Sequence, residues 1–252
     1  MSMDNSISRG LTTLGLLLAI GLSLGAFILG NQTRNIGSGR QTILVKGLAQ
    51  KHIKADRAEW HVGIKVHGAT FAQALTKLRQ ARPQLSDFLS HQGFAKETLK
   101  ESAETVDPNM IDEELANGRY RSVQKGYNAS QEITVTTGDL ARATTAAKAV
   151  LQLKADGTPV YYSAPLYLVS DLEAVKMSLI GAATQNARMR AEEFAKNGNV
   201  RVGSMRSARQ GAFYILAPDA SIDATDYGGI YDKSTINKIA RVVVTIEYNI
   251  EK

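Results

Sequence analysis

The stretch that decides the fold is residues 58–93, "AEWHVGIKVHGATFAQALTKLRQARPQLSDFLSHQG", in which the spacing of apolar residues changes once. Over residues 60–66 every second side chain is apolar, which predicts a strand with one buried face and one face in water. Over residues 71–89 apolar side chains recur at helical spacing, and Gly93 then favours a helix end. Pro83 is expected to kink or split this helix, because proline lacks a backbone donor.

The same two patterns continue along the rest of the chain. The order of the predicted elements is β-β-α-β-β-α-β-α-β-β. The predicted extended segments are a first one at 42–68, a hairpin of 97–107 and 119–138 around an acidic loop, a short strand within 158–169, and strands at 200–216 and 241–250. Two further helices are predicted at 139–157 and 171–198. Strand pairs separated by single helices indicate an α+β fold. We expect largely antiparallel sheets with about three helices packed on one face.

An uncharged run, "LTTLGLLLAIGLSLGAFILG" at residues 11–30, precedes this pattern, and no ionisable residue lies between Arg9 and Arg34. About 20 helical residues cross a hydrocarbon core roughly 30 Å thick. A cleaved export signal would have a shorter apolar run, a more basic leader and an Ala-x-Ala-like site, and a buried soluble helix would carry a polar stripe. Length and flanks therefore favour a permanent membrane anchor, spanning from Leu11 to Leu29, over a cleaved signal.

The predicted organisation has four parts, which are a tail at 1–9, the anchor at 10–33, a linker at 34–40 and a domain at 41–252. The anchor contains two small-x-x-x-small spacings, which begin at Gly21 and Ala26. Such spacings permit close approach of two helices in lipid. Besides the lipid bilayer, a second copy of the chain is therefore a candidate partner of the anchor.

Charge and composition bound the partners further. The net charge of +6 is spread along the chain without a basic block, which argues against a nucleic-acid partner, because such partners need a concentrated basic stripe and stacking aromatics. The chain has no cysteine, so disulfides, thiolate nucleophiles and cysteine metal sites are excluded. More basic residues follow the anchor than precede it. By the positive-inside rule this small bias alone would place the domain in the cytoplasm.

Possible metal ligands have poor spacing. Four histidines occur, at His52, His61, His67 and His91. Two of them, His61 and His67, share the exposed face of a predicted strand but lie roughly 20 Å apart, too far for one metal ion. Two acidic groups, Asp112, Glu113 and Glu114 in the first and Asp219, Asp223, Asp226 and Asp232 in the second, lack the alternating ligand spacing of a calcium loop. We expect both groups to be solvated loops, with a weak cation site as the less favoured alternative.

Catalytic motifs are equally sparse. The chain has no G-x-S-x-G turn and no glycine-rich phosphate loop, and Ser163 and Ser170 have no neighbouring histidine in the sequence. We therefore expect no catalytic residue, cofactor or metal ion. If a hydrolase-like site is assembled only in space, Glu59, His61 and the late aspartates are the first candidates. A small-ligand pocket would instead use three tyrosines, Tyr161, Tyr162 and Tyr167.

Several segments together resemble the SIMPL-domain family. They are a first strand with Gly47, "HIKADRAEWHVGIKVHG" at 52–68, "AATQNARMRAEEFAKNGNVRVGSM" at 182–205 and "RVVVTIEYNI" at 241–250. The resemblance extends from Gln41 to Ile250. It departs from the family at Ala49, where a second glycine is common, and at Ala55, where proline is common before Asp56. Both departures fall at turn positions.

The resemblance implies an exported bacterial envelope protein, because members of the family are typically of this kind. Some members are linked to oxidative-stress defence or noted as surface antigens, and their biochemical activity is undefined. It carries over no catalytic residue. It favours a domain on the periplasmic side of the inner membrane, against the weak charge bias. Long strands with exposed edges favour pairing between chains. We expect a non-enzymatic envelope protein that acts by assembly or binding, with a homo-oligomer as the expected state and an envelope enzyme or small-ligand binder as alternatives.

Overall fold

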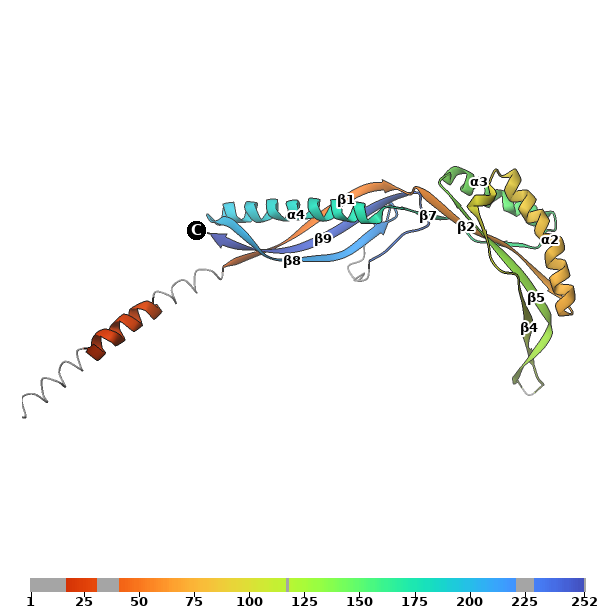
Figure 1. Ribbon diagram of the computed structural model, residues 1–252, viewed down its shortest axis with the longest axis horizontal. Helices are drawn as coiled ribbons and strands as arrows, with labels where there is room; N and C mark the ends of the chain where they lie inside the picture. Colours follow the sequence, from red (N-terminus) through yellow and green to blue (C-terminus); the bar gives the residue numbers. More distant parts are fainter. Residues whose placement is uncertain (1–16, 31–40, 117, 221–228, 252) are drawn as a thin grey trace, which may run out of the picture. The chain divides into compact units, whose positions relative to one another are not determined.

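The computed structural model of the chain describes residues 17–30, 41–116, 118–220 and 229–251 (Figure 1). Residues 17–30 are helical. The later elements are β1 (Thr42–Lys54), β2 (Arg57–Gly68), α2 (Phe71–His91), a 3-10 turn (Lys96–Thr98), β3 (Leu99–Glu101), β4 (Thr105–Glu114), β5 (Tyr120–Thr137), α3 (Leu140–Ala155), β6 (Val160–Tyr162), β7 (Leu166–Leu168), α4 (Leu172–Asn197), β8 (Arg201–Leu216) and β9 (Asn237–Glu251). The predicted α+β class is confirmed.

The chain divides into two compact units. Unit 1 holds the described parts of Met1–Ala49, Ile180–Gly211 and Val243–Lys252, and unit 2 holds Gln50–Leu179 and Ala212–Val242. Four elements, β1, α4, β8 and β9, contribute residues to both units. The strands form two sheets, one of three strands in the order β1-β9-β8 and one of six built on β2 and β5.

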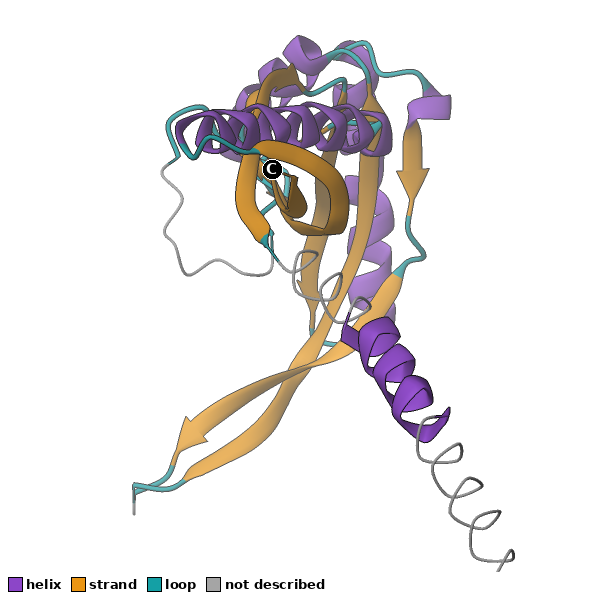
Figure 2. Ribbon diagram, turned by 90° about the vertical axis from the view of Figure 1, so that its left-hand side faces the viewer, coloured by secondary structure: helices purple, strands orange, loops and turns teal. Residues whose placement is uncertain are grey.

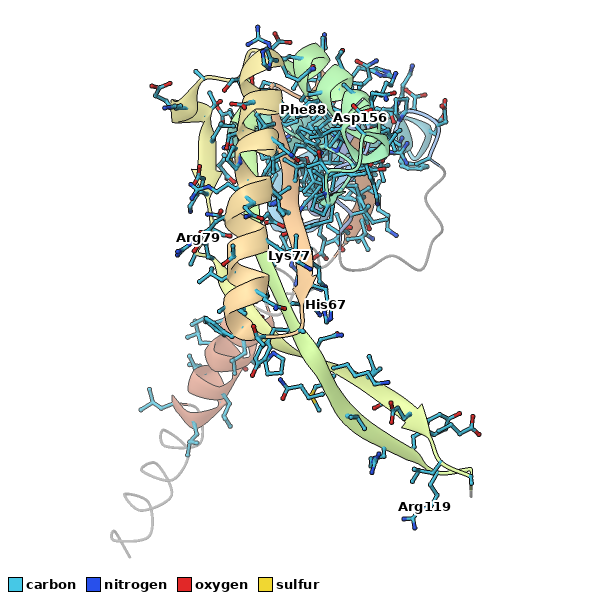
Figure 3. The ribbon with its side chains drawn as sticks, turned by 90° about the vertical axis from the view of Figure 1, so that its right-hand side faces the viewer. His67, Lys77, Arg79, Phe88, Arg119 and Asp156 are labelled. Atoms are coloured by element: carbon cyan, nitrogen blue, oxygen red, sulfur yellow. The ribbon has the colours of Figure 1, made fainter. Side chains whose placement is uncertain are left out.

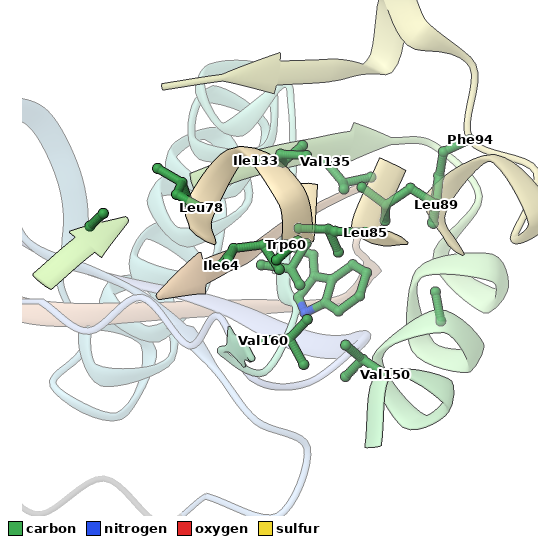
Figure 4. Close-up of a cluster of buried hydrophobic side chains, with 14 of the residues drawn as sticks. Trp60, Ile64, Leu78, Leu85, Leu89, Phe94, Ile133, Val135, Val150 and Val160 are labelled. Carbon is green, nitrogen blue, oxygen red and sulfur yellow. The ribbon is translucent and has the colours of Figure 1, made fainter. Parts of the chain in front are cut away.

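The six-stranded sheet of unit 2 is antiparallel throughout. The pairing of β2 with β5 runs from Ala58 opposite Thr137 to Gly68 opposite Tyr127, and β6 and β7 pair with the other side of β2. Helices α2 and α3 pack on one face of this sheet and enclose a core around Trp60 (Figure 4). The indole nitrogen of Trp60 donates to the Ser163 carbonyl at 2.9 Å, so the buried ring leaves no unpaired donor. The expected strand alternation over residues 60–66 is thereby confirmed.

Helix α2 is not split at Pro83. The helix begins after Thr70, whose side chain accepts from the Gln73 amide, and it continues through Pro83 without a break. Proline leaves the carbonyl of Arg79 without its helical partner. Both residues lie on the exposed side of α2, where water can satisfy that carbonyl, so the predicted split does not occur.

Two predicted loops are wrong in part. The acidic loop at 108–118 is mostly strand, because β4 continues to Glu114 and pairs with β5 as far as Tyr120. The late loop at 217–238 is packed at its end, where Tyr231 forms a bridge with Ile215 of β8 and Lys238 is buried. In both places a segment becomes ordered by pairing with a strand elsewhere in the sequence. The local pattern of apolar and polar residues does not reveal such a partner. Residues 221–228 lie outside the described chain.

In unit 1 the alanine-rich part of α4 runs along the strands of the three-stranded sheet (Figure 1). The alanines of α4 that face the sheet are fully or almost fully buried, at Ala183, Ala187, Ala191 and Ala195. Gly47 of β1 lies directly under this row. A Cβ at Gly47 would come within 2.0 Å of the Ala183 carbonyl oxygen. Small side chains on both elements thus allow the helix backbone to approach the strand closely.

The N-terminal helix exposes most of its apolar side chains, among them Leu17, Leu22 and Phe27. In the part of the chain that is described, no helix reaches the combined length and hydropathy that crossing a bilayer requires. Residues 1–9, 10–16, 31–33 and 34–40 lie outside the described residues. The anchor from Leu11 to Leu29 therefore stays a prediction.

Candidate functional site

The open face of the six-stranded sheet, opposite α2 and α3, carries a polar cluster. Antiparallel register places His61 opposite Thr134 and Gly63 opposite Glu132. Glu59 lies two residues before His61 on β2 and therefore on the same face. Side chains at alternate positions of neighbouring strands share one face. The sheet therefore brings Glu59, His61, Glu132 and Thr134 together from two strands far apart in sequence.

His61 is at the centre of this cluster. Its Nδ1 lies 3.0 Å from Glu132 Oε1, and its Nε2 lies 3.2 Å from Glu59 Oε1. The Thr134 hydroxyl lies 3.3 Å from the same Nδ1. A neutral imidazole donates from only one nitrogen, so both carboxylate bonds form together only when the ring carries both protons. About a third of each of the side chains of His61, Glu59 and Glu132 remains exposed.

Tyr161 of β6 extends the cluster on the same face. Its ring lies over Gly63, where an added Cβ would come within 2.5 Å of the ring carbon Cζ. Burial and the neighbouring Glu132 carboxylate raise the pKa of Tyr161. Since a raised pKa keeps the phenol protonated, the Tyr161 hydroxyl retains its proton beside Glu132. Glu132 therefore lies beside both His61 and Tyr161.

The chemistry open to this cluster is limited by its internal bonding. The two carboxylates bind opposite nitrogens of one ring, so their oxygens do not converge on a common point for a metal ion. Within the described ranges, no three His, Asp or Glu side chains are placed to share one. Ser163 lies near His61, but its hydroxyl donates to the backbone oxygen of His61, at 3.5 Å, and not to the imidazole ring. The cluster presents acceptors and negative charge at an exposed sheet face.

The late aspartates do not join this cluster in the described contacts. Asp232 accepts hydrogen bonds from Ser234 and Thr235, and from the ammonium of Lys238 at 3.2 Å. Lys238 also donates to the Asp232 carbonyl oxygen at 2.6 Å, and its side chain is completely buried. This pair ties the segment before β9 to that strand. Asp219 is exposed, and Asp223 and Asp226 lie outside the described residues.

The three tyrosines lie in three different surroundings. Tyr161 is on the open sheet face, and Tyr162, the next residue of β6, packs against the core under the helices. Tyr167 is buried beside Ala55, Ala58 and Ala143, where its hydroxyl lies 2.7 Å from that of Thr144. These positions fit strand residues that pack on a sheet and do not form a shared pocket.

The other residues considered from the sequence are either exposed or paired with a neighbouring side chain, away from the His61 cluster. His52, His67 and His91 are exposed. The Ser170 hydroxyl donates to Asp56 at 2.9 Å. Glu113, one of the three acids of the earlier group, forms ion pairs with Lys125 and Arg121 on β5, and the hydrogen bond from Lys125 lowers its pKa.

Sequence reasoning found Glu59 and His61 but missed Glu132 and Thr134. The signal was present in the alternation of β5, whose residues 128, 130, 132 and 134 share one face. The register that sets Glu132 beside His61 depends on the pairing of β2 with β5 across a long insertion, and no local pattern fixes it.

Comparison with known proteins gives one strong match. None of the curated proteins matches the chain. Among solved structures, a hydrolase from Listeria innocua shares 10% identity over 77% of this chain and 91% of its own, with a TM-score of 0.21. An uncharacterized conserved protein from the same organism shares 11% identity over the same fractions of the two chains, with a TM-score of 0.20. TM-scores this low establish no common fold.

The family comparison covers most of the described domain. The family model matches residues 43–236, from the first strand to the segment before the last one. This range contains the first strand with Gly47 and the segments at 52–68 and 182–205 that carry the sequence resemblance, whereas the last of them, at 241–250, lies beyond it. The chain belongs to the SIMPL family, whose description is "Protein of unknown function (DUF541)".

Proposed function

We propose that the chain is a periplasm-facing protein, tethered to the bacterial inner membrane, that acts without catalysis by self-assembly. The observation that carries this proposal is the arrangement of the three-stranded sheet. Its two outer strands, β1 and β8, are 13 and 16 residues long. Among the described strands each pairs with β9 alone, although Ile215 near the end of β8 is hydrogen-bonded to residues 230–232. An outer strand presents a row of unpaired amide and carbonyl groups, which is a template for pairing with another chain.

These two strands are only partly protected: each carries three lysines or arginines, and the Leu48 amide of β1 donates to Asn186 of α4. Neither contains proline, and both expose apolar side chains, with Leu44 on β1 67% exposed and Met205 on β8 46% exposed. Natural edge strands are commonly blunted by proline, inward-pointing charge or a covering element. Pairing between copies would satisfy the open backbone groups and cover both side chains. Self-complementary surfaces usually produce closed symmetric assemblies.

The tether and the compartment rest on the sequence. The uncharged run up to Arg34 is long enough to cross a bilayer, and the family resemblance favours the periplasmic side. A role in envelope or oxidative stress would follow from that resemblance alone. A hydrolase-like role receives less support, because both ring nitrogens of His61 are already bonded to carboxylates.

The proposal is tested by placing a charge on each edge. The double variant Leu44→Lys, Met205→Lys adds two exposed lysines to the edge strands, and Leu151→Lys adds one to the exposed side of α3 as a control. Light scattering of the full chain in detergent measures the protein mass of each. We expect the edge variant to lose the multimer that the wild type and the control retain, because like charges oppose strand pairing. Equal masses for all three would refute edge pairing.

A further inference from the structure

The β4–β5 hairpin extends beyond the rest of its sheet. We call residues 110–114 of β4 and 120–125 of β5 the arm; Arg119 lies at its tip (Figures 2 and 3). The pairing of β2 with β5 ends at Gly68 opposite Tyr127, so the described arm strands pair with each other alone. The base is marked by a register shift between Pro108 and Met110 and by Gly126, whose φ is 77°. Each strand of the arm therefore has one open edge.

The two strands of the arm carry opposite charge. The β4 side contains three acids, Asp112, Glu113 and Glu114, and no base, whereas the β5 side contains Arg121 and Lys125 and no acid. The arm is also partly apolar, since Met110 and Tyr120 are more than half exposed. A ribbon with one acidic edge and one basic edge is complementary to a second copy of itself.

Within the arm, the pairing of β4 with β5 sets which residues lie opposite each other. A strand added to either edge in the same register would form the same rows. Ile111 stands opposite Val123, and Glu113 stands opposite Arg121. The Glu113 carboxylate lies 2.5 Å from the Lys125 ammonium and 3.8 Å from the Arg121 guanidinium. The remaining rows set Met110 opposite Gln124, Asp112 opposite Ser122 and Glu114 opposite Tyr120. No row places two like charges together.

We propose that arms of neighbouring copies pair head to tail, with the β4 edge of one copy antiparallel to the β5 edge of the next. In the register that the arm itself uses, each Arg121 then lies between two Glu113 side chains, and the Ile111–Val123 row continues across the junction. Opposite charges directly across two strands stabilise their pairing, and like charges destabilise it. Pairing β4 with β4 would oppose acids with acids, and pairing β5 with β5 would oppose bases with bases. Charge therefore selects the head-to-tail arrangement.

This inference deepens the proposed self-assembly and rests on it, but it uses a surface separate from β1 and β8. A head-to-tail contact joins two different edges, so repetition leads to a ring if the rotation closes. The partner in this contact is a second copy of the same chain.

The absence of native cysteine allows a direct test. Asp112→Cys in one full-length chain and Ser122→Cys in a second, differently tagged chain are co-expressed, oxidised in the membrane and separated on a non-reducing gel. Directly opposed residues of antiparallel strands have Cα atoms about 4.5–5.5 Å apart, within the range that a disulfide spans. We expect a dimer that carries both tags, several-fold stronger than the dimer from either single variant alone. Gln80→Cys, on the exposed side of α2, replaces Ser122→Cys in the control.

Three results would overturn the head-to-tail arm. They are a mixed dimer no stronger than the Gln80→Cys control, a dominant dimer of Asp112→Cys with itself, and a mixed-dimer yield that rises with salt, since screening weakens exposed ion pairs. Light scattering of the same full chain separates this failure from that of the proposed function. A multimer without the mixed disulfide removes only the arm contact, whereas a monomer removes self-assembly as well.

Discussion

Gly47→Ala is expected to force α4 away from β1. The added Cβ would lie 2.0 Å from the Ala183 carbonyl oxygen and 2.8 Å from the Ala187 Cβ. Weak carbon–oxygen contacts are about 3.3–3.6 Å long, so the gap must open by more than 1 Å. The nearest atom belongs to a helix backbone and cannot rotate away as a flexible side chain could.

The expected cost follows from overpacking of a filled interior. Extra methyl groups in such places destabilise by about 1–3 kcal/mol, and a backbone clash belongs at the upper end. For a chain of this size, each kcal/mol lowers Tm by about 2–4 °C. We therefore expect Gly47→Ala to lower the thermal midpoint by about 5–10 °C.

The matched control lies on the helix itself. Gly181 of α4 has nothing within 4 Å of an added Cβ, and alanine is a better helix former than glycine by about 0.5–1 kcal/mol. Gly181→Ala should therefore raise the midpoint slightly. The same substitution thus has opposite signs at two positions of unit 1.

Far-UV circular dichroism of the full chain measures both midpoints. Fluorescence of Trp60, the single tryptophan of the chain, reports separately on the core of unit 2. If Gly47→Ala and Gly181→Ala shifted the midpoint by the same amount, the close approach of α4 to β1 would be refuted.

Three further changes follow from side-chain contacts. Lys238→Met should cost about 3 kcal/mol, because it leaves the Asp232 carboxylate, mostly buried, without its cation; an unchanged urea midpoint would contradict the pairing. Burial raises the pKa of Asp232, but hydrogen bonds from Thr235, Ser234 and Lys238 outweigh it and hold the pKa below the ordinary 3.8. The stability from these bonds is therefore complete above about pH 4 and is lost as pH falls further; Asp232→Asn should flatten this acid limb of the urea midpoint, and a limb of unchanged slope would assign it to other groups. Pro83→Ala should raise the free energy of unfolding by about 1–2 kcal/mol, and with it the thermal midpoint, because it restores the missing helical bond on the exposed side of α2; a lower midpoint would show that the proline ring contributes packing.

The strands and helices with strong periodicity were predictable from sequence. The alternation at residues 60–66 and the amphipathic spacing of α2 each specify a buried face, and both are found. The division of the strands between two sheets was not predictable, because alternation shows that a strand has a buried face but not which strand lies beside it. The acidic end of β4 also escaped, since Asp, Asn and Pro are depleted in strands and only its pairing with β5 makes it one.

The candidate site was predictable to the same extent. Glu59 and His61 share a face of one strand and contact each other, whereas Glu132 joins them only through the register of β2 with β5. Lys238 was missed although its position alternates in step with the buried Ala240 and Val242 of β9. A lysine at a buried position of a strand is a signal to look for an acidic partner.

Whether the chain self-assembles is decided by the protein mass of the wild-type full chain in detergent, measured by light scattering. We expect one discrete species at a whole-number multiple of 27.3 kDa that persists on dilution. A species of 27.3 kDa at every concentration would contradict it.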